Sequence, residues 1–362
     1  MPGWSHLLID WFSRHRRPMP WRETPSPYKV WISEIMLQQT QVATVIPYFE
    51  RFLTRFPDVY TLAGAESQDV LKCWEGLGYY SRARHLQAAA RQIVALGAFP
   101  STAAAWKVLP GIGPYTAAAI ASIAFGEPVP SIDGNVLRVY SRFRGIPDDL
   151  RRAPVRRAIY SELESALREV DPSTFNQAMM ELGALVCRPK RPDCGECPLH
   201  TDCTARQQHL TDAIPFKPVK LAVPHHIEVA AIIIDAGQRV LVYRRPERGL
   251  LAGLWEFPCL RREHRELLRT VVQQGIGQKT GLDLTDIRPL GRVNHAFSHF
   301  TQTFHVLACR TTSLEGKAAL PPDAQALRWC SRAEIEALPM SKVHRTIAGM
   351  LLDRCLENQR TQ

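Results

Sequence analysis

Four cysteines in the middle of the chain have a spacing that suits a shared metal centre. They fall within seventeen positions, at Cys187, Cys194, Cys197 and Cys203. Structural zinc sites usually draw on two close pairs of ligands, and only one close pair is present here, so an iron–sulfur cluster held by four thiolates fits better. Four unligated thiols at this density would be prone to oxidation. We interpret the segment 187–203 as the loop of a structural iron–sulfur cluster. Its basic residues, Arg188, Lys190 and Arg191, would face phosphate.

Two carboxylates stand in contexts that allow acid–base chemistry. Glu34 lies in the apolar stretch VWISEIML, residues 30–37, whose side chains should partly desolvate it and raise its pKa toward that of a general acid. Its other reading is a Glu on the wet face of an amphipathic helix. Asp133, in SIDGN, precedes a helical pattern that begins near Val136, where an Asp most often serves as an N-cap. A cap and a catalytic role are compatible.

A tight turn, LPGIG at residues 109–113, stands between two helical stretches. Gly111 and Gly113 let backbone N–H groups approach an anion at the start of the following helix, so the turn is typical of a helix-hairpin-helix that grips DNA phosphate. A turn of this kind is by itself more often a plain connection. Tyr115 follows it directly, at the start of an Ala-rich helix.

These residues must be positioned by at least two domains, because 362 residues exceed the usual size of one. Helical spacing runs from Trp4 to about Val186, which predicts an all-α domain at 1–207. A Pro-rich stretch without periodicity at 208–226 is the expected linker. Residues 227–362 then combine β-branched runs, a Gly-containing hairpin turn and two helical patterns, so we expect an α+β domain there.

The bulk composition places limits on the class of protein. Hydrophobic residues make up 45% of the chain and charged residues 22%, with no apolar run of membrane-spanning length. The basic residues of the first segment follow its apolar residues, the reverse of a secretory signal, so we expect a cytoplasmic protein. We also expect it to be a monomer that associates with DNA. The net charge of +10 is compatible with a polyanionic partner or with a solvated basic surface.

The order of hairpin, Gly-rich Asp loop and cysteine loop resembles the endonuclease III superfamily of base-excision DNA glycosylases. The stretch SEIMLQQTQV, residues 33–42, narrows the resemblance to the MutY-type adenine DNA glycosylases, and with the C-terminal domain it covers nearly the whole chain. The resemblance implies hydrolysis of the glycosidic bond of adenine mispaired with 8-oxoguanine or guanine in double-stranded DNA. It makes Glu34 the general acid and Asp133 the stabiliser of the oxocarbenium ion, by electrostatics or as a transient nucleophile, with Asn135 orienting the site.

The same resemblance implies that the cluster is of the 4Fe–4S type, and it gives roles to further residues. The lyase branch of the superfamily has a Lys where this chain has Tyr115, which cannot form a Schiff base and instead lines the pocket, so a monofunctional glycosylase is implied. A base must be extruded from the duplex before it is cleaved. Tyr79, in GLGYYSR, resembles the family's intercalating residue, with Gln39 beside it, whereas Tyr80 is as well explained by packing at a helix corner.

The C-terminal domain resembles a Nudix fold. Its region corresponding to the Nudix box offers only Glu263 and Glu266, so metal-dependent nucleotide hydrolysis is not expected. In MutY-type proteins this domain checks the base opposite adenine, and the matching loop, NHAFSHF, has Phe297, Ser298 and His299 as readers. His295 is interpreted as an ordinary strand residue.

Three other functions remain as alternatives to an adenine DNA glycosylase. They are a bifunctional pyrimidine glycosylase and lyase, a non-catalytic DNA-binding protein, and a nucleotide hydrolase.

Overall fold

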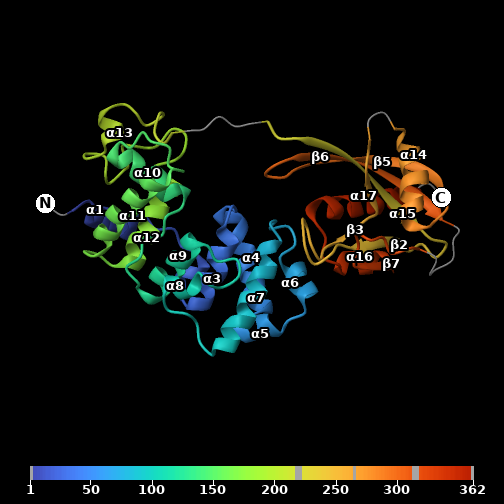
Figure 1. Cartoon of the computed structure of the whole chain (residues 1–362), viewed down its shortest axis with the longest axis horizontal. Coiled ribbons are helices and arrows are strands. Elements are labelled where there is room, and N and C mark those ends of the chain that lie inside the picture. Colours follow the sequence, from blue (N-terminus) through green and yellow to red (C-terminus); the bar gives the residue numbers. More distant parts are fainter. Residues whose placement is uncertain (1–2, 217–221, 264–265, 312–317, 360–362) are drawn as a thin grey trace. The chain divides into compact units, whose positions relative to one another are not determined.

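The chain forms two compact units (Figure 1). The computed structural model describes residues 3–216, 222–263, 266–311 and 318–359, with side chains described up to residue 351. Unit 1 contains Met1–Gly64 and His85–Lys220, and unit 2 contains Ala65–Arg84 and Leu221–Gln362. Within the described residues no helix has the length and apolar character needed to span a membrane.

Unit 1 is helical, as the sequence predicts. Its helices are α1 (Trp4–His15), α2 (Pro20–Glu23), α3 (Pro27–Leu37), α4 (Val42–Arg55), α5 (Val59–Gly64), α7 (Ser81–Leu96, which enters from unit 2), α8 (Ala103–Trp106), α9 (Pro114–Phe125), α10 (Gly134–Arg144), α11 (Ala153–Leu167), α12 (Pro172–Leu185) and α13 (Thr204–Gln207).

One core of unit 1 lies among α1, α10, α11 and α12. In α1 the apolar residues Leu8, Trp11 and Phe12 recur at helical spacing and are buried against this core. The start of α10 is fixed by Asp133, whose side chain accepts a hydrogen bond from the backbone N–H of Val136. The expected N-cap role of Asp133 is therefore confirmed.

Helix α3 is buried on every side rather than along one stripe. Eight of its residues are buried, from Tyr28 to Met36, and Glu34 is one of them. A helix that is covered all round belongs to the interior of a domain. The wet-face reading of Glu34 is therefore wrong, because α4 and α9 both pack against this short helix.

Unit 2 is a mixed sheet with helices on both faces. Its elements are α6 (Ser67–Cys73), β1 (His225–Ile234), β2 (Val240–Arg244), β3 (Trp255–Glu256), β4 (Cys259–Arg261), α14 (Leu268–Thr270), a π-helical segment (Val271–Ile276), α15 (Gly277–Thr280), β5 (Leu284–Ala296), β6 (Thr301–Thr311), β7 (Ala326–Cys330), α16 (Arg332–Ala337) and α17 (Lys342–Gln359).

The strand order is β3-β2-β1-β6-β5, with β4 pairing β1 and β7 pairing β2. Strands β1 and β6 run parallel, and the β1–β2 and β5–β6 pairs are antiparallel. Alternate residues of β1 enter different cores: Val229 packs with the π-helical segment, and Ala230 packs with α16 and α17. The sheet is thus covered on both faces, which explains why β1 reads as a continuous apolar run.

The two units divide the chain differently from the domains expected at 1–207 and 227–362. Residues Ala65–Arg84, which contain α6, group with the C-terminal part of the chain. This grouping rests on long-range contacts that no local pattern records, such as the hydrogen bond from Gln68 Nε2 to the carbonyl oxygen of Gly253, 3.0 Å long. Five residues of the linker expected at 208–226, residues 217–221, lie outside the described residues.

Candidate active site

Glu34 lies in the interior of unit 1 with only 6% of its surface exposed. Burial raises the pKa of Glu34 to about 7. The negative charge of Asp133 acts in the same direction, because a second carboxylate nearby disfavours ionisation. A carboxyl group with this pKa holds a proton in a substantial fraction of molecules at neutral pH, as a general acid requires.

Tyr115 reaches Glu34 from the first turn of α9. Its hydroxyl donates a hydrogen bond to Glu34 Oε2 at 3.1 Å and lies 3.1 Å from the sulfur of Met180. This hydrogen bond opposes the effect of burial on the pKa of Glu34. Burial itself raises the pKa of Tyr115 well above its usual value, so the phenol is neutral and acts as a donor. The bulky residue after the hairpin therefore contacts the buried acid directly.

Asp133 is held by hydrogen bonds to both carboxylate oxygens. Oδ1 accepts the Val136 backbone N–H at 2.7 Å, and Oδ2 accepts the Asn135 side-chain amide at 2.8 Å. Asn135 is held in turn by Arg138, whose guanidinium donates to Asn135 Oδ1 at 2.9 Å and to the carbonyl oxygen of Cys187 at 2.8 Å. The carboxylate is thus fixed in orientation and connected to the first cysteine of the loop.

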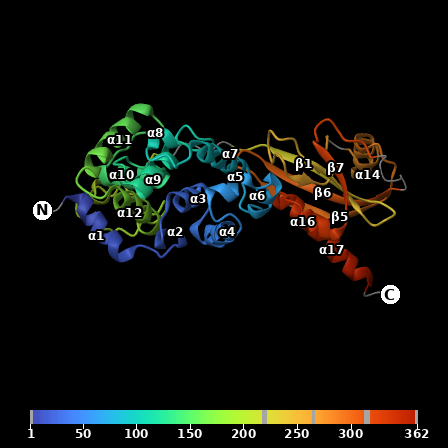
Figure 2. The same cartoon turned by 90° about the horizontal axis from the view of Figure 1, so that it is seen from below.

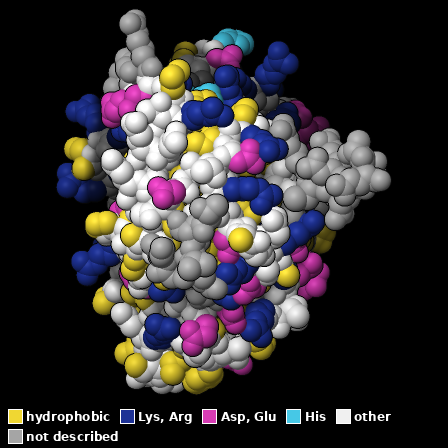
Figure 3. Space-filling view, turned by 90° about the vertical axis from the view of Figure 1, so that its right-hand side faces the viewer, with side chains coloured by type: hydrophobic (Ala, Val, Ile, Leu, Met, Phe, Trp, Pro, Cys, Tyr) yellow, Lys and Arg dark blue, Asp and Glu magenta, His cyan; other side chains and the backbone are white. Residues whose placement is uncertain are grey.

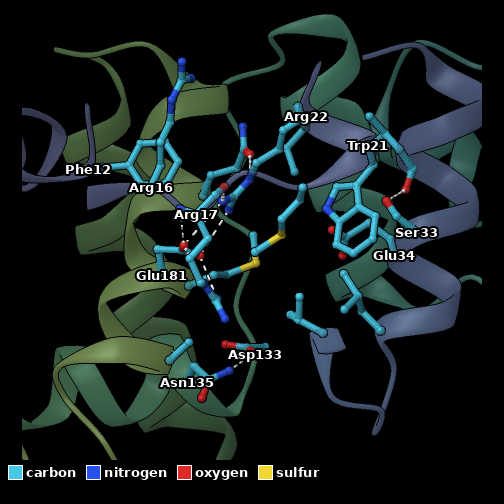
Figure 4. Close-up of a pocket in the computed structure, with 18 of the residues that line it drawn as sticks. Phe12, Arg16, Arg17, Trp21, Arg22, Ser33, Glu34, Asp133, Asn135 and Glu181 are labelled. Atoms are coloured by element: carbon cyan, nitrogen blue, oxygen red, sulfur yellow. Dashed lines mark hydrogen bonds and ion pairs between the residues drawn. The ribbon is translucent and has the colours of Figure 1, made fainter. Parts of the chain in front are cut away.

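One cavity of about 910 Å³ is lined by Glu34, Tyr115, Asp133 and Asn135 (Figure 4). These four residues come from α3, α9 and the start of α10, up to 101 positions apart in sequence. Figure 4 shows Glu34 and Asp133 on different walls of the same space. The two carboxylates that the sequence singled out are therefore brought to one site, with the volume expected of a ligand pocket.

The cavity also contains a charged cluster that sequence reasoning missed. Glu181 is 2% exposed and accepts hydrogen bonds from Arg17 Nε at 2.8 Å and Arg22 Nη2 at 3.2 Å. Burial opposes ionisation of Glu181, but Arg17 and Arg22 outweigh it and hold its pKa below the usual value. Arg22 Nε donates to Gln177 Oε1 at 2.9 Å as well. The two arginines lie more than 150 positions from Gln177 and Glu181, so no local pattern in the sequence indicates that they pair. The only signal in the sequence is the concentration of Arg residues near the start of the chain.

The hairpin presents its glycines at the surface. Gly111 has a φ of +75°, and a Cβ atom there would stand 2.6 Å from His85 Cβ. Both the backbone conformation and the lack of space therefore require glycine at this position. Gly113 has a φ of −84° and is the N-cap of α9. Both are exposed, whereas Ile112 between them is buried. Helix α9 therefore starts from an exposed residue, and the first N–H groups of a helix have no acceptor within it, which is the arrangement that suits an anion.

Comparison with known proteins relates the chain to two families of domains and to curated proteins. Residues 32–165 match the HhH-GPD superfamily of base excision DNA repair proteins, and residues 229–349 match the NUDIX domain. The chain is 35% identical to a human adenine DNA glycosylase, covering 98% of this chain and 76% of the relative. It is 33% identical to the adenine DNA glycosylase of Buchnera aphidicola from Acyrthosiphon pisum, covering 82% and 83%.

The chain belongs to the adenine DNA glycosylase family. It is a DNA glycosylase, hence a hydrolase of N-glycosidic bonds. A solved structure of a thermostable thymine-DNA glycosylase is similar to it with a TM-score of 0.52 and 26% identity, over 56% of this chain and 95% of that one.

The four cysteines of this glycosylase surround one small pocket. All four are free thiols and half-buried. The Arg142 guanidinium lies 3.5 Å from the sulfur of Cys187 and donates to the Arg188 carbonyl oxygen at 2.7 Å, so positive charge adjoins the thiols. Among the described residues no group of three or more His, Cys, Asp or Glu side chains stands close enough to bind a single metal ion. The donor set, four cysteines around one space with a cation in the wall, fits a thiolate-ligated cluster.

The loops expected to contact DNA are exposed in the glycosylase. Gln39 and Tyr79 both have left-handed backbones, with φ of +57° and +47°, and Arg191 in the cysteine loop has +49°. Non-glycine residues held in this region gather at binding sites and catalytic sites. Tyr79 is 46% exposed, whereas Tyr80 is buried, as its packing interpretation predicts. Arg188, Lys190 and Arg191 are all exposed.

The expected reading loop connects β5 to β6 in unit 2. Phe297 stacks on Phe300 with ring centroids 4.4 Å apart, and its backbone N–H donates to the carbonyl oxygen of Phe300 at 2.8 Å. This stacked pair closes the loop and leaves Ser298 and His299 exposed at its tip, where Ser298 Oγ lies 3.1 Å from His299 Nδ1. His295 is half-buried at the end of β5, in edge-to-face contact with Phe297.

The two acidic residues of the region corresponding to the Nudix box lie just before a helix. Glu263 and Glu266 precede Leu268, the first residue of α14, and Glu266 accepts a hydrogen bond from the Glu263 backbone N–H at 2.9 Å. They are therefore not on a helix that presents carboxylates to a metal. On the face that Figure 3 shows, Lys and Arg side chains are interspersed with Asp and Glu.

Proposed function

We propose that the chain removes adenine mispaired with 8-oxoguanine or guanine from double-stranded DNA, as a monofunctional glycosylase in base-excision repair. The observation that carries the proposal is that Glu34, with a pKa raised to about 7, lines the same cavity as Asp133. Cleavage of a bond to a poor leaving group needs a proton for the base and negative charge for the sugar cation, and two carboxylates in different environments supply both.

The proposed reaction proceeds in two stages. Glu34 donates its proton to the imidazole ring nitrogen of the extruded adenine, and the bond from the sugar carbon to the base breaks with its electron pair going to the base. Asp133 faces the resulting oxocarbenium ion and stabilises it, through space or through a transient covalent bond. Water then adds to the sugar carbon and gives up its proton to the Glu34 carboxylate, which restores the starting state.

The charged cluster of the cavity supports a purine as the group that enters. Arg17, Arg22 and Gln177 bring N–H donors and an amide to the lining of the cavity, which also includes Trp21 and Glu34. Figure 4 labels Arg17, Arg22, Trp21 and Glu34 around this space. A heteroaromatic base offers ring nitrogens as acceptors and an amino group as donor, so this wall has complementary chemistry. The ion pairs with Glu181 hold the two arginines in place, so they need no reorganisation when a base enters.

Tyr115 supports hydrolysis without strand cleavage. A phenol cannot form the Schiff base that a lyase needs, and the hydroxyl of Tyr115 is already committed to Glu34. We therefore expect water to be the nucleophile that completes the reaction. Borohydride should trap no abundant covalent adduct with DNA, and an abundant adduct would favour the bifunctional alternative.

We also propose that Cys187, Cys194, Cys197 and Cys203 bind a 4Fe–4S cluster. When bound, the cluster cross-links the loop and does no bond-breaking chemistry. Its expected effect is to hold Arg188, Lys190 and Arg191 toward DNA phosphate. Replacing Cys197 with Ser should lower the iron and sulfide content of the purified protein and weaken DNA binding, whereas Cys73→Ser, a change outside the loop, should leave both unchanged.

The lesion check is proposed to lie in unit 2, at the exposed tip formed by Ser298 and His299. Both side chains offer hydrogen-bond donors and acceptors to a base edge or to the groove. We expect Ser298→Ala combined with His299→Ala to narrow the preference for 8-oxoguanine over guanine. An unchanged ratio would remove this role from the loop.

The function is tested by single-turnover release of adenine from duplexes that place it opposite 8-oxoguanine, guanine or cytosine. We expect release in the first two, fastest with 8-oxoguanine. Glu34→Gln should retain DNA binding and lose nearly all cleavage. A Glu34→Gln variant as fast as the parent would show that the acid is another group.

A further inference from the structure

Residues Ala65–Arg84 are separated from the rest of unit 2 by more than 130 positions, yet they are part of it. We call them the Tyr79 segment. Helix α6 of this segment lies beside α16, as Figure 2 shows. The Lys72 ammonium donates a hydrogen bond to the carbonyl oxygen of Leu338, just beyond the end of α16, at 3.3 Å. The segment is therefore attached to the Nudix-like module itself.

Gln68 provides one attachment with both ends of its amide. Its Nε2 donates to the carbonyl oxygen of Gly253 at 3.0 Å, and its Oε1 accepts from the indole N–H of Trp255 at 2.9 Å. Leu71 packs close to Gly253, since a Cβ atom at that glycine would stand 3.3 Å from Leu71 Cδ1. Residues 253–255 are thus attached to α6 through its residues Gln68 and Leu71.

Glu75 and Arg345 provide a second attachment. Arg345 Nε donates to Glu75 Oε1 at 2.7 Å, and its Nη2 donates to Oε2 at 3.2 Å. The same guanidinium donates to the carbonyl oxygens of Ile335 and Leu338 at 3.0 Å and 2.6 Å. A bidentate pair in which the arginine is also fixed by backbone carbonyls has a defined geometry, unlike an ordinary surface ion pair.

Tyr80 provides the third attachment, one residue after Tyr79. Its side chain is 5% exposed, and its hydroxyl donates to the Met340 carbonyl oxygen at 3.1 Å while accepting from the Gly76 backbone N–H at 3.2 Å. Tyr79 itself points outward with a φ of +47°. Its ring lies 5.5 Å from the Arg82 guanidinium, which also lies 5.4 Å from the buried Trp74 ring. The exposed ring thus lies next to Arg82, whose guanidinium donates hydrogen bonds to the carbonyl oxygens of Leu77 and Gly78 within the same segment. The segment that supports the ring is the one attached through Gln68, Glu75 and Tyr80.

We propose that Glu75 and Arg345 are positioning residues through which the Nudix-like module sets the orientation of Tyr79 during base extrusion. This inference rests on the proposed function, in which Tyr79 intercalates. The module that checks the opposite base then also holds the wedge that replaces the extruded base. Recognition and extrusion are coupled because one folded unit performs both, and a strained, exposed residue keeps its geometry only while the structure around it is fixed.

The experiment measures extrusion separately from cleavage in the full-length protein. A duplex with 2-aminopurine next to the target adenine reports unstacking by fluorescence, and single-turnover release reports chemistry. Glu75→Arg opposes Arg345 with a like charge. Glu66→Arg, at an exposed position of the same segment, is the matched control because it makes the same change of charge. Tyr79→Ala gives the fluorescence change that remains when the intercalating ring is absent. Circular dichroism melting verifies the folding of each variant.

We expect Glu75→Arg to lower the fluorescence change and to slow release by about tenfold, and Glu66→Arg to match the parent. The double variant Glu75→Arg with Arg345→Glu restores the pair in reverse and should recover part of the loss. If Glu75→Arg fails to fold, Glu75→Gln takes its place, because it keeps the shape of the side chain and removes its charge. It should lower the fluorescence change and the release rate in the same direction, by a smaller amount.

The outcomes separate this inference from the proposed function. If Tyr79→Ala abolishes unstacking and both Glu75 variants behave as the parent, the positioning role is wrong while the wedge stands. Absence of recovery in the folded double variant would also count against the pair. If Tyr79→Ala unstacks the duplex normally, both the intercalation and the inference are wrong. Failure of the parent to release adenine would overturn the proposed function, and the fluorescence comparison would still decide the coupling.

Discussion

The hydroxyl of Tyr115 donates a hydrogen bond to Glu34 Oε2 across 3.1 Å, although 81 positions separate the two residues. One group is a neutral phenol and the other is a carboxyl whose pKa burial raises to about 7. The bond stabilises the ionised form of Glu34 and so counteracts part of the effect of burial. Burial and the hydrogen bond from Tyr115 are thus the two largest influences on the pH at which Glu34 becomes charged.

This pairing predicts the pH dependence of cleavage. The protonated form of Glu34 is the donor, so the single-turnover rate should fall by about tenfold per unit as the pH rises beyond the pKa of about 7. Tyr115→Phe removes a bond that lowers the pKa, so the midpoint of this fall should move to higher pH. Tyr160→Phe, at a half-exposed tyrosine of the same unit, serves as the control. Equal midpoints in all three proteins would contradict the coupling.

The same shift predicts how stability changes with pH. The pKa of Glu34 is 4.5 in its unperturbed state and about 7 in the folded protein, so the folded state binds more protons between these values. Its contribution to stability is fully present below pH 4.5 and is lost as the pH rises to about 7, a change of about 3 kcal/mol. Glu34→Gln should therefore be more stable than the parent near pH 8 by up to about 3 kcal/mol, with a small difference near pH 5. Urea unfolding at both pH values measures this, and a difference independent of pH would be inconsistent with a buried acid.

Asp133 has a structural and a proposed catalytic role that can be separated by substitution. Asn caps a helix about as well as Asp, so Asp133→Asn should keep the hydrogen bond from the Val136 N–H, although its amide nitrogen cannot accept from Asn135. It should slow cleavage by roughly 10²- to 10³-fold. Asp133→Ala should lose about 1 kcal/mol of stability in addition. Asp171 caps α12 in the same manner, accepting the Thr174 backbone N–H at 2.7 Å, and supplies the control. Asp171→Ala should lose stability and keep its rate; a similar loss of rate there would mean that capping alone explains Asp133.

The two hairpin glycines should respond differently to alanine. Gly111→Ala places a Cβ at positive φ against His85 and should cost about 1–3 kcal/mol of stability. Gly113→Ala has an ordinary φ and no described atom within 4 Å of the added carbon, so stability should not change. If the N–H groups here bind phosphate, the methyl group of Gly113→Ala should still weaken duplex binding by roughly tenfold. Full affinity in the stable variant would remove the hairpin from the DNA contact.

The helical and α+β halves could be predicted because their evidence is local. Periodicity, turn residues and the Asp133 cap each involve a few neighbouring positions, and the resemblance of SEIMLQQTQV identified the family from contiguous residues. The charged cluster of Glu181 with Arg17 and Arg22 could not be predicted in this way. Its members are ordinary surface residues by type, and only the packing of α12 against the start of the chain makes them a buried ion network.

The sequence by itself determined which residues can do chemistry: a Glu among apolar neighbours, an Asp at a helix start, four spaced cysteines and a glycine hairpin. The tertiary structure decided their working state. Burial of α3 from all sides, together with Asp133 nearby, moves the pKa of Glu34 to about 7, and folding attaches residues 65–84 to a module encoded more than 130 positions later. The reason is physical: composition and spacing act between neighbours in the chain, whereas desolvation and charge pairing depend on neighbours in space.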